Sequence, residues 1–391
     1  MITFDEAYKI VMDSVLATGA EKISFIGAEG RVLAEDVSSD MDMPPFNRAA
    51  VDGYACRKED IKNELEMIEV IAAGKEPSMQ VGRNQCSKIM TGAIVPQGCD
   101  IVFMIEDSEV LPSGRIKFRG DNLKPNLSLK GEDVRTGDIV LRKGKLIKPQ
   151  DVAVLASVGH TEVLVRTMPE IGIISTGDEL VEPHMKPAVS QIRNSNAYQL
   201  LSQVVRAGGK ARYYGIAPDT GDYTFDFITR AINENDIVIL TGGVSMGDFD
   251  FVPAFLKKAG VKILFNRINV QPGKPTTFGI HPQAVIFGLP GNPVSSFIQF
   301  ETLVRPLMAK MMDSDWKPVL QTLPMGARYM RKSVSRMGWI PVFVNENGEA
   351  MPVEYHGSAH LSALPFADGI IRIEPGVNVI EKGDIVKLRY L

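Results

Sequence analysis

Glycine, hydroxyl and acidic side chains are concentrated directly after a short apolar stretch at residues 236–240. That stretch, Asp-Ile-Val-Ile-Leu, predicts a strand of a parallel sheet that is buried on both faces. The run Thr-Gly-Gly-Val-Ser-Met-Gly-Asp-Phe-Asp follows at 241–250. Glycines let backbone N–H groups approach a bound anion, while Asp248 and Asp250 are suited either to hold a divalent cation or to cap the next helix. Because ligands of open α/β sheets bind beyond the carboxyl ends of strands, we expect a ligand site here.

Three other apolar stretches run into loops of the same kind. Residues 171–174 lead into Ser-Thr-Gly-Asp-Glu-Leu, residues 284–287 into Gly-Leu-Pro-Gly-Asn-Pro, and residues 268–270 into Gln-Pro-Gly-Lys-Pro. If the four strands are parallel neighbours, their loops meet at one edge of the sheet and form a site for a phosphate-bearing ligand. The candidate binding residues in these loops are Thr176, Gly177, Asp178, Gly242, Gly243, Ser245, Gly247, Asp248, Pro290, Gly291, Asn292 and Pro293.

The overall composition excludes several classes of protein. The chain has 391 residues, of which 45% are hydrophobic and 23% charged, and its net charge of −4 argues against general nucleic-acid binding. Its three cysteines are odd in number and form no Cys-x-x-Cys pair, which argues against a disulfide framework or a structural zinc site. No apolar run approaches the roughly 18 residues of a membrane helix. We therefore expect a cytoplasmic protein with small-molecule substrates and with no nucleic-acid or membrane partner.

Four regions of different character position the candidate residues. At the N-terminus, Thr3 and Glu6 match a capping box at the start of an amphipathic helix. Residues 44–135 consist of short alternating runs broken by turns, which predict a β-rich segment. From about 170 to 311, strands and helices alternate, which predicts a parallel sheet with helices on both faces. The short strands after residue 312 predict a small all-β domain.

Several candidate residues also have a purely structural interpretation. Asp178 and Asp250 are suited to cap helices, and the Gly-Gly pair could simply close a turn. Asn292, followed by Pro293 at the first helical position, is expected to cap a long helix over 294–312. Asp52 precedes a glycine and, taken alone, is typical of a turn.

Seven motifs, in order along most of the chain, resemble those of the MoeA family of molybdopterin molybdenumtransferases, which includes the E domain of gephyrin. One glycine-rich loop would be weak evidence, but seven ordered motifs identify the chain as a member of this family. The motifs are Pro-Pro-Phe and Val-Asp-Gly-Tyr-Ala at 44–55, Thr-Gly-Ala with a later Pro and Asp at 91–100, Gly-Glu-Asp at 131–133, Ser-Thr-Gly-Asp-Glu-Leu at 175–180, Gly-Gly-Val-Ser-Met-Gly-Asp at 242–248, Pro-Gly-Lys-Pro at 272–275 and Gly-Leu-Pro-Gly-Asn-Pro at 288–293.

The resemblance implies a multidomain α/β plus β fold and a homodimer whose protomers share an active-site cleft. The central parallel α/β domain would be similar to the MoaB and Mog proteins and would bind molybdopterin. The implied domains are an N-terminal region over 1–167, the α/β domain over 168–311 and a C-terminal β domain over 312–391. Within the N-terminal region, residues 1–18 would form a helix that packs on the α/β domain, and residues 44–135 would form an inserted β-rich domain. Residues 19–43 and 136–167 would together form a connecting domain.

The same resemblance implies the reaction and the roles of individual residues. The substrates would be adenylylated molybdopterin and molybdate, and AMP would be released with Mg²⁺ bound by Glu179 and Asp250. Lys274 would supply positive charge to phosphate or molybdate, Ser358 would join the binding residues, and a molybdopterin adenylyltransferase is a candidate partner. The implied catalytic residues are Asp52, Thr91, Asp133, Glu179, Asp250 and Lys274.

The chain departs from the family pattern in two places and leaves two other functions open. The segment 338–342, where some family members carry an anion-binding arginine, contains none, so Arg331 or Arg336 is the candidate replacement. Asn47 and Ala49 stand where Asp and Ser are often found. A non-catalytic scaffold that holds a pterin nucleotide and a molybdopterin adenylyltransferase are the alternative functions. The sequence does not distinguish molybdate from tungstate as the oxyanion.

Overall fold

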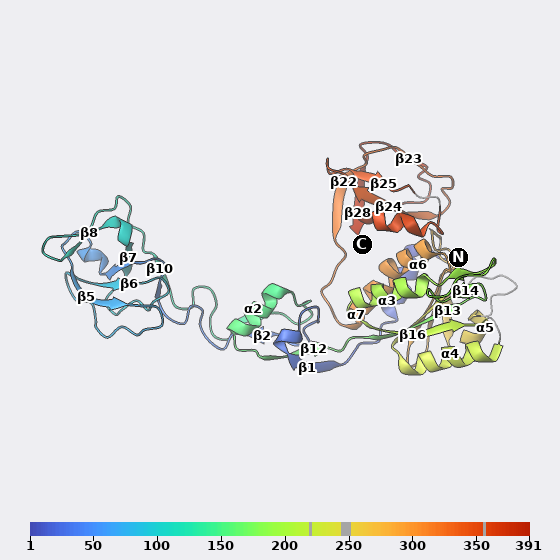
Figure 1. Cartoon of the computed structure of the whole chain (residues 1–391), viewed down its shortest axis with the longest axis horizontal. Coiled ribbons are helices and arrows are strands. Elements are labelled where there is room, and N and C mark those ends of the chain that lie inside the picture. Colours follow the sequence, from blue (N-terminus) through green and yellow to red (C-terminus); the bar gives the residue numbers. More distant parts are fainter. Residues whose placement is uncertain (219–220, 244–251, 355–356) are drawn as a thin grey trace. The chain divides into compact units, whose positions relative to one another are not determined.

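The computed structural model describes residues 1–218, 221–243, 252–354 and 357–391. Backbone contacts divide the chain into two compact units (Figure 1). The first unit holds residues 1–35, 144–148 and 163–391, and the second holds 36–143 and 149–162. Among the helices of the described ranges, none is both long and apolar enough to cross a membrane.

The first unit is built around a six-stranded mixed sheet. The strands β16, β13, β17 and β21 are parallel neighbours, as predicted. By contrast, β20 is antiparallel to both β21 and β18, so the sheet is parallel only in part. In order across the sheet, the strands are β16 (Lys210–Ala217), β13 (Glu170–Thr176), β17 (Ile237–Thr241), β21 (Val285–Leu289), β20 (Thr277–Ile280) and β18 (Lys262–Phe265).

Alternate residues of the central strand β17 face two separate cores. Ile237 and Ile239 pack into the core that lies under α3 (Asn196–Arg206) and the last helices of the sheet domain. Val238 and Leu240 pack into the core under α4 (Gly221–Glu234) and α5 (Val252–Lys258). Helices therefore cover both faces of the sheet (Figure 1), and the prediction of a strand buried on both faces is confirmed.

The long helix predicted over 294–312 is interrupted. It consists of α6 (Pro293–Gln299), the π-helical turn η4 (Phe300–Val304) and α7 (Arg305–Met311). Pro293 occupies the first turn, as predicted from its fixed φ angle. The hydrophobic pattern does not reveal the π-turn, because all five of its residues are buried like the rest of the helix.

Helix α1 (Phe4–Asp13) begins at the predicted capping box. Glu6 N–H donates to Thr3 Oγ1 at 3.2 Å, and Thr3 N–H donates to Glu6 Oε2 at 2.8 Å. Phe4 is buried against the same core as α3 and α7, and its ring meets that of Trp339 edge-on. Arg372 makes two hydrogen bonds with the Asp5 carboxylate, at 2.7 and 2.8 Å. The helix is thereby tied to both the sheet domain and the C-terminal strands.

The C-terminal part of the first unit is a second sheet, as the short strands after residue 312 predict. One of its strands, β19, comes from the α/β segment and pairs in parallel with β24. The prediction that residues 268–270 belong to the central sheet is therefore wrong. The strands are β19 (Val270–Gln271), β24 (Met337–Val344), β26 (Gly369–Ile373), β28 (Ile385–Tyr390) and β22 (Leu320–Pro324), with β25 (Ala350–Pro352) paired to β24.

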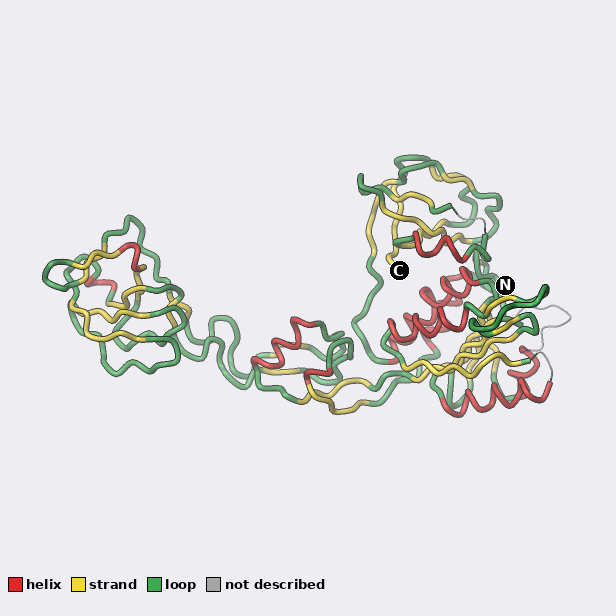
Figure 2. Tube along the Cα trace, in the orientation of Figure 1, coloured by secondary structure: helices red, strands yellow, loops and turns green. Residues whose placement is uncertain are grey.

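The second unit is rich in strands, as predicted for residues 44–135 (Figure 2). Its main sheet buries apolar side chains on both faces in two small cores. The sheet contains β5 (Glu66–Ile71), β6 (Gln85–Ile89), β4 (Gly53–Cys56) and β7 (Ile101–Met104). The unit also contains β2 (Val37–Ser38), β3 (Arg48–Ala49), η2 (Lys58–Asp60), η3 (Ile105–Asp107), β8 (Ser108–Val110), β9 (Ile116–Phe118), β10 (Leu127–Ser128), β11 (Ile139–Leu141) and α2 (Pro149–Ser157).

Short elements complete the first unit. The strands β1 and β12 form a two-stranded ribbon, and β14 pairs in parallel with β15 near the sheet edge. These elements are β1 (Ala20–Ser24), η1 (Phe25–Gly27), β12 (Glu162–Arg166), β14 (Leu180–Val181), β15 (Ile192–Arg193), β23 (Tyr329–Met330), η5 (Leu361–Phe366) and β27 (Val379–Ile380).

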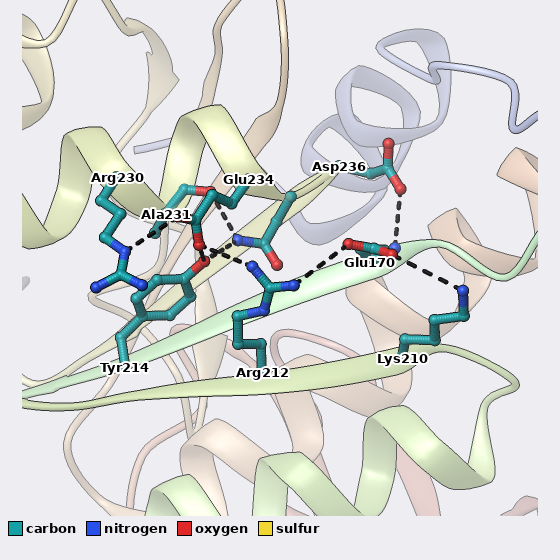
Figure 3. A network of polar contacts seen from close by, with 9 residues as sticks. Glu170, Lys210, Arg212, Tyr214, Arg230, Ala231, Glu234 and Asp236 are labelled. Carbon is teal, nitrogen blue, oxygen red and sulfur yellow. Dashed lines mark hydrogen bonds and ion pairs between the residues drawn. The ribbon is translucent and has the colours of Figure 1, made fainter.

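A polar network covers the amino ends of the central strands (Figure 3). Glu170 N–H donates to Asp236 Oδ2 at 2.8 Å, which joins the starts of β13 and β17. Tyr214 O–H and Arg212 Nη1 both donate to Glu234 Oε2 at 2.7 Å. The Tyr214 hydrogen bond is the main reason that the pKa of Glu234 falls to about 2. The charges of this network are thus paired with one another at the amino ends of the strands.

Candidate functional site

The loops that follow β13, β17 and β21 meet at the carboxyl edge of the central sheet. Gly242 N–H donates to Leu289 O at 3.3 Å, and a side chain on Gly242 would overlap the carbonyl of Thr176. Gly242 and Gly243 have φ angles of +89° and +57°. Glycine is required at Gly242 because the left-handed backbone and the close approach to Thr176 both exclude a larger side chain. Three of the four loops that the sequence predicts at this edge thus follow parallel strands that end there.

The fourth loop, residues 271–276, reaches the same edge by a different route from the one predicted. It does not leave a parallel strand; it enters the antiparallel strand β20. Thr277 at the start of β20 pairs with Gly288 near the end of β21, so β20 begins at the edge where β21 ends. Lys274 therefore lies near the Pro290–Asn292 loop, although the strand assignment behind that expectation is incorrect.

A cavity of about 710 Å³ opens beside these loops, between the α/β domain and the C-terminal strands of the first unit. Its lining carries positive charge from Lys274, Arg331, Lys332 and Arg336. Hydroxyl and amide groups from serines and an asparagine stand beside these cations, and no described residue of the lining is acidic. We call this cavity the oxyanion pocket, because cations and neutral donors without carboxylates suit a small anion. These asparagine and serine donors are Asn292, Ser295, Ser333 and Ser358, and the lining also includes Gln271, Tyr329 and Trp339.

Asn292 and Ser358 form one wall of the oxyanion pocket. Asn292 occupies the N-cap position of α6, as predicted, but its side chain makes no capping hydrogen bond. Instead, Asn292 Nδ2 donates to Ser358 Oγ at 2.8 Å, and Val294 N–H donates to Ser358 O at 3.1 Å. The backbone carbonyl of Ser358 therefore occupies part of the anion site predicted at the start of α6. The side chains of Asn292 and Ser358, which are hydrogen-bonded to each other, line the oxyanion pocket.

The two arginines proposed to replace the missing family arginine both line the oxyanion pocket. Arg331 is buried, and its Nη2 donates to Arg336 O at 2.6 Å. Burial lowers the pKa of the Arg331 guanidinium. Gly338 leaves room for it, since a Cβ at that position would lie 3.1 Å from Arg331 Cζ. Arg336 Nη1 donates to Val270 O at 3.3 Å. The cation thus comes from the segment between β23 and β24 rather than from β24 itself.

One of the two predicted Mg²⁺ ligands has a defined place. Glu179 is exposed at the carboxyl edge next to Asp178, and its carboxylate folds back over Gly177, where a side chain would overlap it. Ser245, Gly247, Asp248 and Asp250 lie outside the described residues. Within the described ranges, no group of three His, Cys, Asp or Glu side chains could hold a metal ion. A single carboxylate fits Mg²⁺, which is commonly held by one or two carboxylates together with substrate phosphates.

Asp52 and Thr91, in the second unit, are joined by hydrogen bonds. Asp52 Oδ1 accepts from both the backbone N–H and the Oγ1 of Thr91, each at 2.7 Å. These two hydrogen bonds, with the one from the backbone as the larger effect, lower the pKa of Asp52. Asp133 is exposed elsewhere in the same unit, where its N–H donates to Met43 O at 3.0 Å. The structure thus joins two of these three predicted residues.

Asn47, one of the departures from the family pattern, has a structural role in the second unit. Its Oδ1 accepts a hydrogen bond from Lys130 N–H at 2.8 Å, which fixes the turn that leads to Asp133. Ala49 is buried in β3, where it pairs with Leu127 of β10. Both departures thus have defined local contacts in the second unit.

Two buried amides at the carboxyl edge are missing from the sequence prediction. Asn196 Nδ2 donates to Thr241 Oγ1 at 2.9 Å and to Gly291 O at 2.7 Å, which joins two of the predicted loops. Gln299 Nε2 donates to Pro272 O at 3.3 Å. Both residues lie on helices with ordinary amphipathic spacing. The one signal in the sequence was a polar side chain at a position where the spacing predicts a buried residue.

The mixed α/β domain has a glycine-rich carboxyl edge with a basic pocket beside it, and two β-rich regions accompany it. These features define a multidomain α/β plus β protein with a candidate anion site at the sheet edge. Residues 2–159 match the MoeA N-terminal region (domain I and II), residues 172–310 the probable molybdopterin binding domain, and residues 326–390 the MoeA C-terminal region (domain IV). The chain belongs to the MoeA family of molybdopterin molybdenumtransferases.

Similar proteins cover the full length of the chain. The molybdopterin molybdenumtransferase of Staphylococcus epidermidis is 32% identical over 98% of this chain and 94% of its own length. That of Haemophilus influenzae is 33% identical over 99% and 98%. The crystal structure of the molybdopterin biosynthesis moeA protein from Pyrococcus horikoshii OT3 is 31% identical, superposes with a TM-score of 0.87 and covers 100% of both chains.

Proposed function

We propose that this molybdopterin molybdenumtransferase inserts molybdenum from molybdate into adenylylated molybdopterin and releases AMP in a Mg²⁺-dependent step. The observation that supports the proposal best is the oxyanion pocket, in which Lys274 and Arg336 face neutral donors without an opposing carboxylate. Tetrahedral oxyanions carry negative charge on every oxygen, so such a pocket stabilises molybdate by charge and by hydrogen bonds from several directions. Membership of the family indicates the two substrates, and the oxyanion pocket is the proposed binding site for one of them, molybdate.

Cleavage of the adenylylated substrate requires stabilisation of a leaving phosphate. The loops with Gly242 and Gly291 lie beside the oxyanion pocket, where backbone close to the ligand can donate N–H groups to phosphate oxygens. Glu179 would hold Mg²⁺ at the same edge, with Asp250 as the second proposed ligand. When bound, the cation would neutralise the phosphate charge that develops as AMP leaves.

The protein's assembly is part of the proposal. We propose a homodimer in which Asp52, Thr91 and Asp133 of one protomer act on the substrate held at the sheet edge of its partner. A molybdopterin adenylyltransferase, which makes the adenylylated substrate, is the proposed source of that substrate. The family resemblance supports both proposals.

The proposed function is tested by AMP release from adenylylated molybdopterin with and without molybdate. Lys274→Ala is expected to lower molybdate-dependent AMP release by roughly 100-fold, because it removes a charge aimed at the anion. Lys262→Ala is the control, since Lys262 is an exposed lysine at the opposite end of the β18–β20 pair. Glu179→Gln is expected to raise the Mg²⁺ concentration needed for half-maximal release.

Two results would contradict this function. Absence of molybdate-dependent turnover in the natural chain would indicate a scaffold that only holds the nucleotide. Consumption of ATP with free molybdopterin would indicate an adenylyltransferase. A Lys274→Ala variant with undiminished release would remove the oxyanion pocket from the mechanism.

A further inference from the structure

The loop that carries Lys274 is anchored in the protein interior. Pro272, Gly273 and Thr276 are buried, whereas Lys274 between them is exposed and lines the oxyanion pocket. The ammonium group therefore projects from a backbone segment that is packed on its other side. The groups that hold this backbone set the position of the charge.

Three consecutive carbonyl groups of the loop accept hydrogen bonds. Lys274 O accepts from Thr276 N–H at 3.0 Å, and Gly273 O accepts from Thr276 Oγ1 at 2.7 Å. Pro272 O accepts from Gln299 Nε2 at 3.3 Å. Lys274 O also accepts from the buried Ile268 N–H at 3.0 Å, while Thr276 belongs to the loop itself. Gln299 is therefore the side-chain donor that connects the loop to a helix, α6.

Gln299 also holds the loop by shape. Its side chain is fully buried, and a side chain on Gly273 would overlap its amide nitrogen. Gly273 has a φ angle of +109°, which a residue with a Cβ rarely adopts. The loop therefore fits closely over the Gln299 amide, and movement of that amide would displace the backbone next to Lys274.

The same helix begins at another part of the oxyanion pocket lining, the wall formed by Asn292 and Ser358. Helix α6 begins after Asn292, whose amide donates to Ser358, and ends at Gln299. Its 7 residues form a rigid spacer about 10 Å long between the two walls. The distance between the Lys274 loop and the Asn292–Ser358 pair is thus set by one helix and by the contact at its end.

We infer that Gln299 is a positioning residue for molybdate: it holds the 271–276 loop against helix α6 so that Lys274 faces the Asn292–Ser358 wall at the separation that the anion requires. The inference rests on the proposed function and adds to it a residue that does not touch the substrate. A pocket for a small tetrahedral anion depends on a narrow range of distances, so loosening one wall weakens binding even when every cation remains.

The test is calorimetric titration of the full-length protein with molybdate alone. Gln299→Met preserves the side-chain length and removes the amide, and we expect roughly tenfold weaker molybdate binding with the fold retained. Gln203→Met is the matched control. Gln203 is a second buried glutamine, its Nε2 donates to the Phe297 carbonyl at 3.3 Å, and it does not line the oxyanion pocket.

Gln203→Met is expected to lose more thermal stability, because it also removes the 2.8 Å hydrogen bond from Gln203 Nε2 to Glu301 Oε1. Only Gln299→Met should lose molybdate affinity. In the AMP-release assay, Gln299→Met should raise the KM for molybdate while kcat at saturation stays close to that of the natural chain. Equal losses of affinity in the Gln203 and Gln299 variants would overturn the positioning role, as would unchanged affinity in Gln299→Met.

If Gln299→Met does not fold, Thr276→Val decides the question, since it removes the hydroxyl that donates to Gly273 O from the same loop. Weaker molybdate binding in Thr276→Val, reported together with faster hydrogen exchange of the 271–276 amides, supports the inference. Natural affinity despite faster exchange overturns it. If the natural chain itself binds no molybdate, both the proposed function and the inference are refuted. If the natural chain binds molybdate and Gln299→Met binds it equally well, only the inference is refuted.

Discussion

Asp52 and Thr91 lie 39 positions apart in the sequence, yet they share two hydrogen bonds to one carboxylate oxygen. Both residues are exposed, so the pair orients a charged group at the surface of the second unit. Because the hydrogen bonds favour the ionised form, the pKa of Asp52 lies below its ordinary value. Asp52 is therefore held as a carboxylate and is suited to accept a hydrogen bond from a substrate.

Thr91→Val should raise the pKa of Asp52 and lower AMP release. The variant keeps the backbone donor and loses the hydroxyl donor, so the pKa moves back toward that of an ordinary aspartate. A folded-state pKa that is depressed gives stability above the unfolded pKa, and this stability is lost as pH falls through the folded pKa. In the variant, that stability contribution should be smaller, and its loss should be complete at a higher pH. Carboxyl-detected NMR titration of Asp52 measures the shift.

The chain contains a matched control for this prediction. Asp42 Oδ1 accepts hydrogen bonds from the N–H and Oγ1 of Thr136, at 2.9 and 3.0 Å, and these hydrogen bonds lower the pKa of Asp42. Thr136→Val should therefore raise the pKa of Asp42 without lowering AMP release. A Thr91→Val variant that shifts the Asp52 titration but keeps full activity would show that the pair is structural.

At the scale of elements, the π-turn η4 places a buried acid where three parts of the first unit meet. Glu301 lies in this turn and is 1% exposed. Its carboxylate accepts from Arg305 Nη1 at 2.9 Å and from Gln203 Nε2 at 2.8 Å, and it also pairs with Arg206 of α3. Arg389 of β28 donates to the Glu301 backbone carbonyl. Helix α3, the last helix and the C-terminal sheet are thus connected at one residue.

Glu301→Gln is expected to destabilise the first unit by about 1–3 kcal/mol, because the buried carboxylate no longer pairs with Arg305 and with the part-exposed Arg206. Urea unfolding measures this change, and the double variant with Arg305→Met should recover part of the loss. Glu234→Gln is the comparison, since Glu234 belongs to the solvated network at the other edge and should cost less. Equal effects at the two glutamates would contradict the role of burial.

The sequence predicts those elements whose signal is local. The capping box of α1, the buried strand β17 and the start of α6 each depend on neighbouring residues, and each is found in the structure. The direction of β20 and the transfer of β19 to the C-terminal sheet depend on pairing partners, which hydrophobic alternation does not specify. The same contrast between local and distant signals applies to the candidate site. The loop residues could be predicted because glycine, hydroxyl and acidic side chains directly follow apolar strands. Asn196 and Gln299 could not, because they act through hydrogen bonds to backbone that is distant in the sequence.

At the scale of the whole molecule, the β-rich part of the second unit is an insertion whose two ends meet. Met43 N–H donates to Val134 O at 2.7 Å, and Val134 N–H donates to Met43 O at 3.1 Å. An antiparallel pair of this kind can be closed by a two-residue turn. Replacement of residues 44–133 by such a turn should therefore leave the first unit folded and able to bind molybdate, while it removes Asp52, Thr91 and Asp133.

This shortened chain tests whether the active site is shared between protomers. Alone it should release no AMP, and full-length Lys274→Ala should release almost none. When the two are co-expressed, a shared cleft pairs the intact sheet edge of the short chain with the intact Asp52 region of its partner. If the two chains pair at random, about half of the dimers contain one chain of each kind. Each mixed dimer has one complete site and one site that lacks both groups. The AMP-release activity should therefore return to roughly a quarter of that of the natural protein. A site formed within one chain allows no such recovery, because every protomer then lacks one of its two halves.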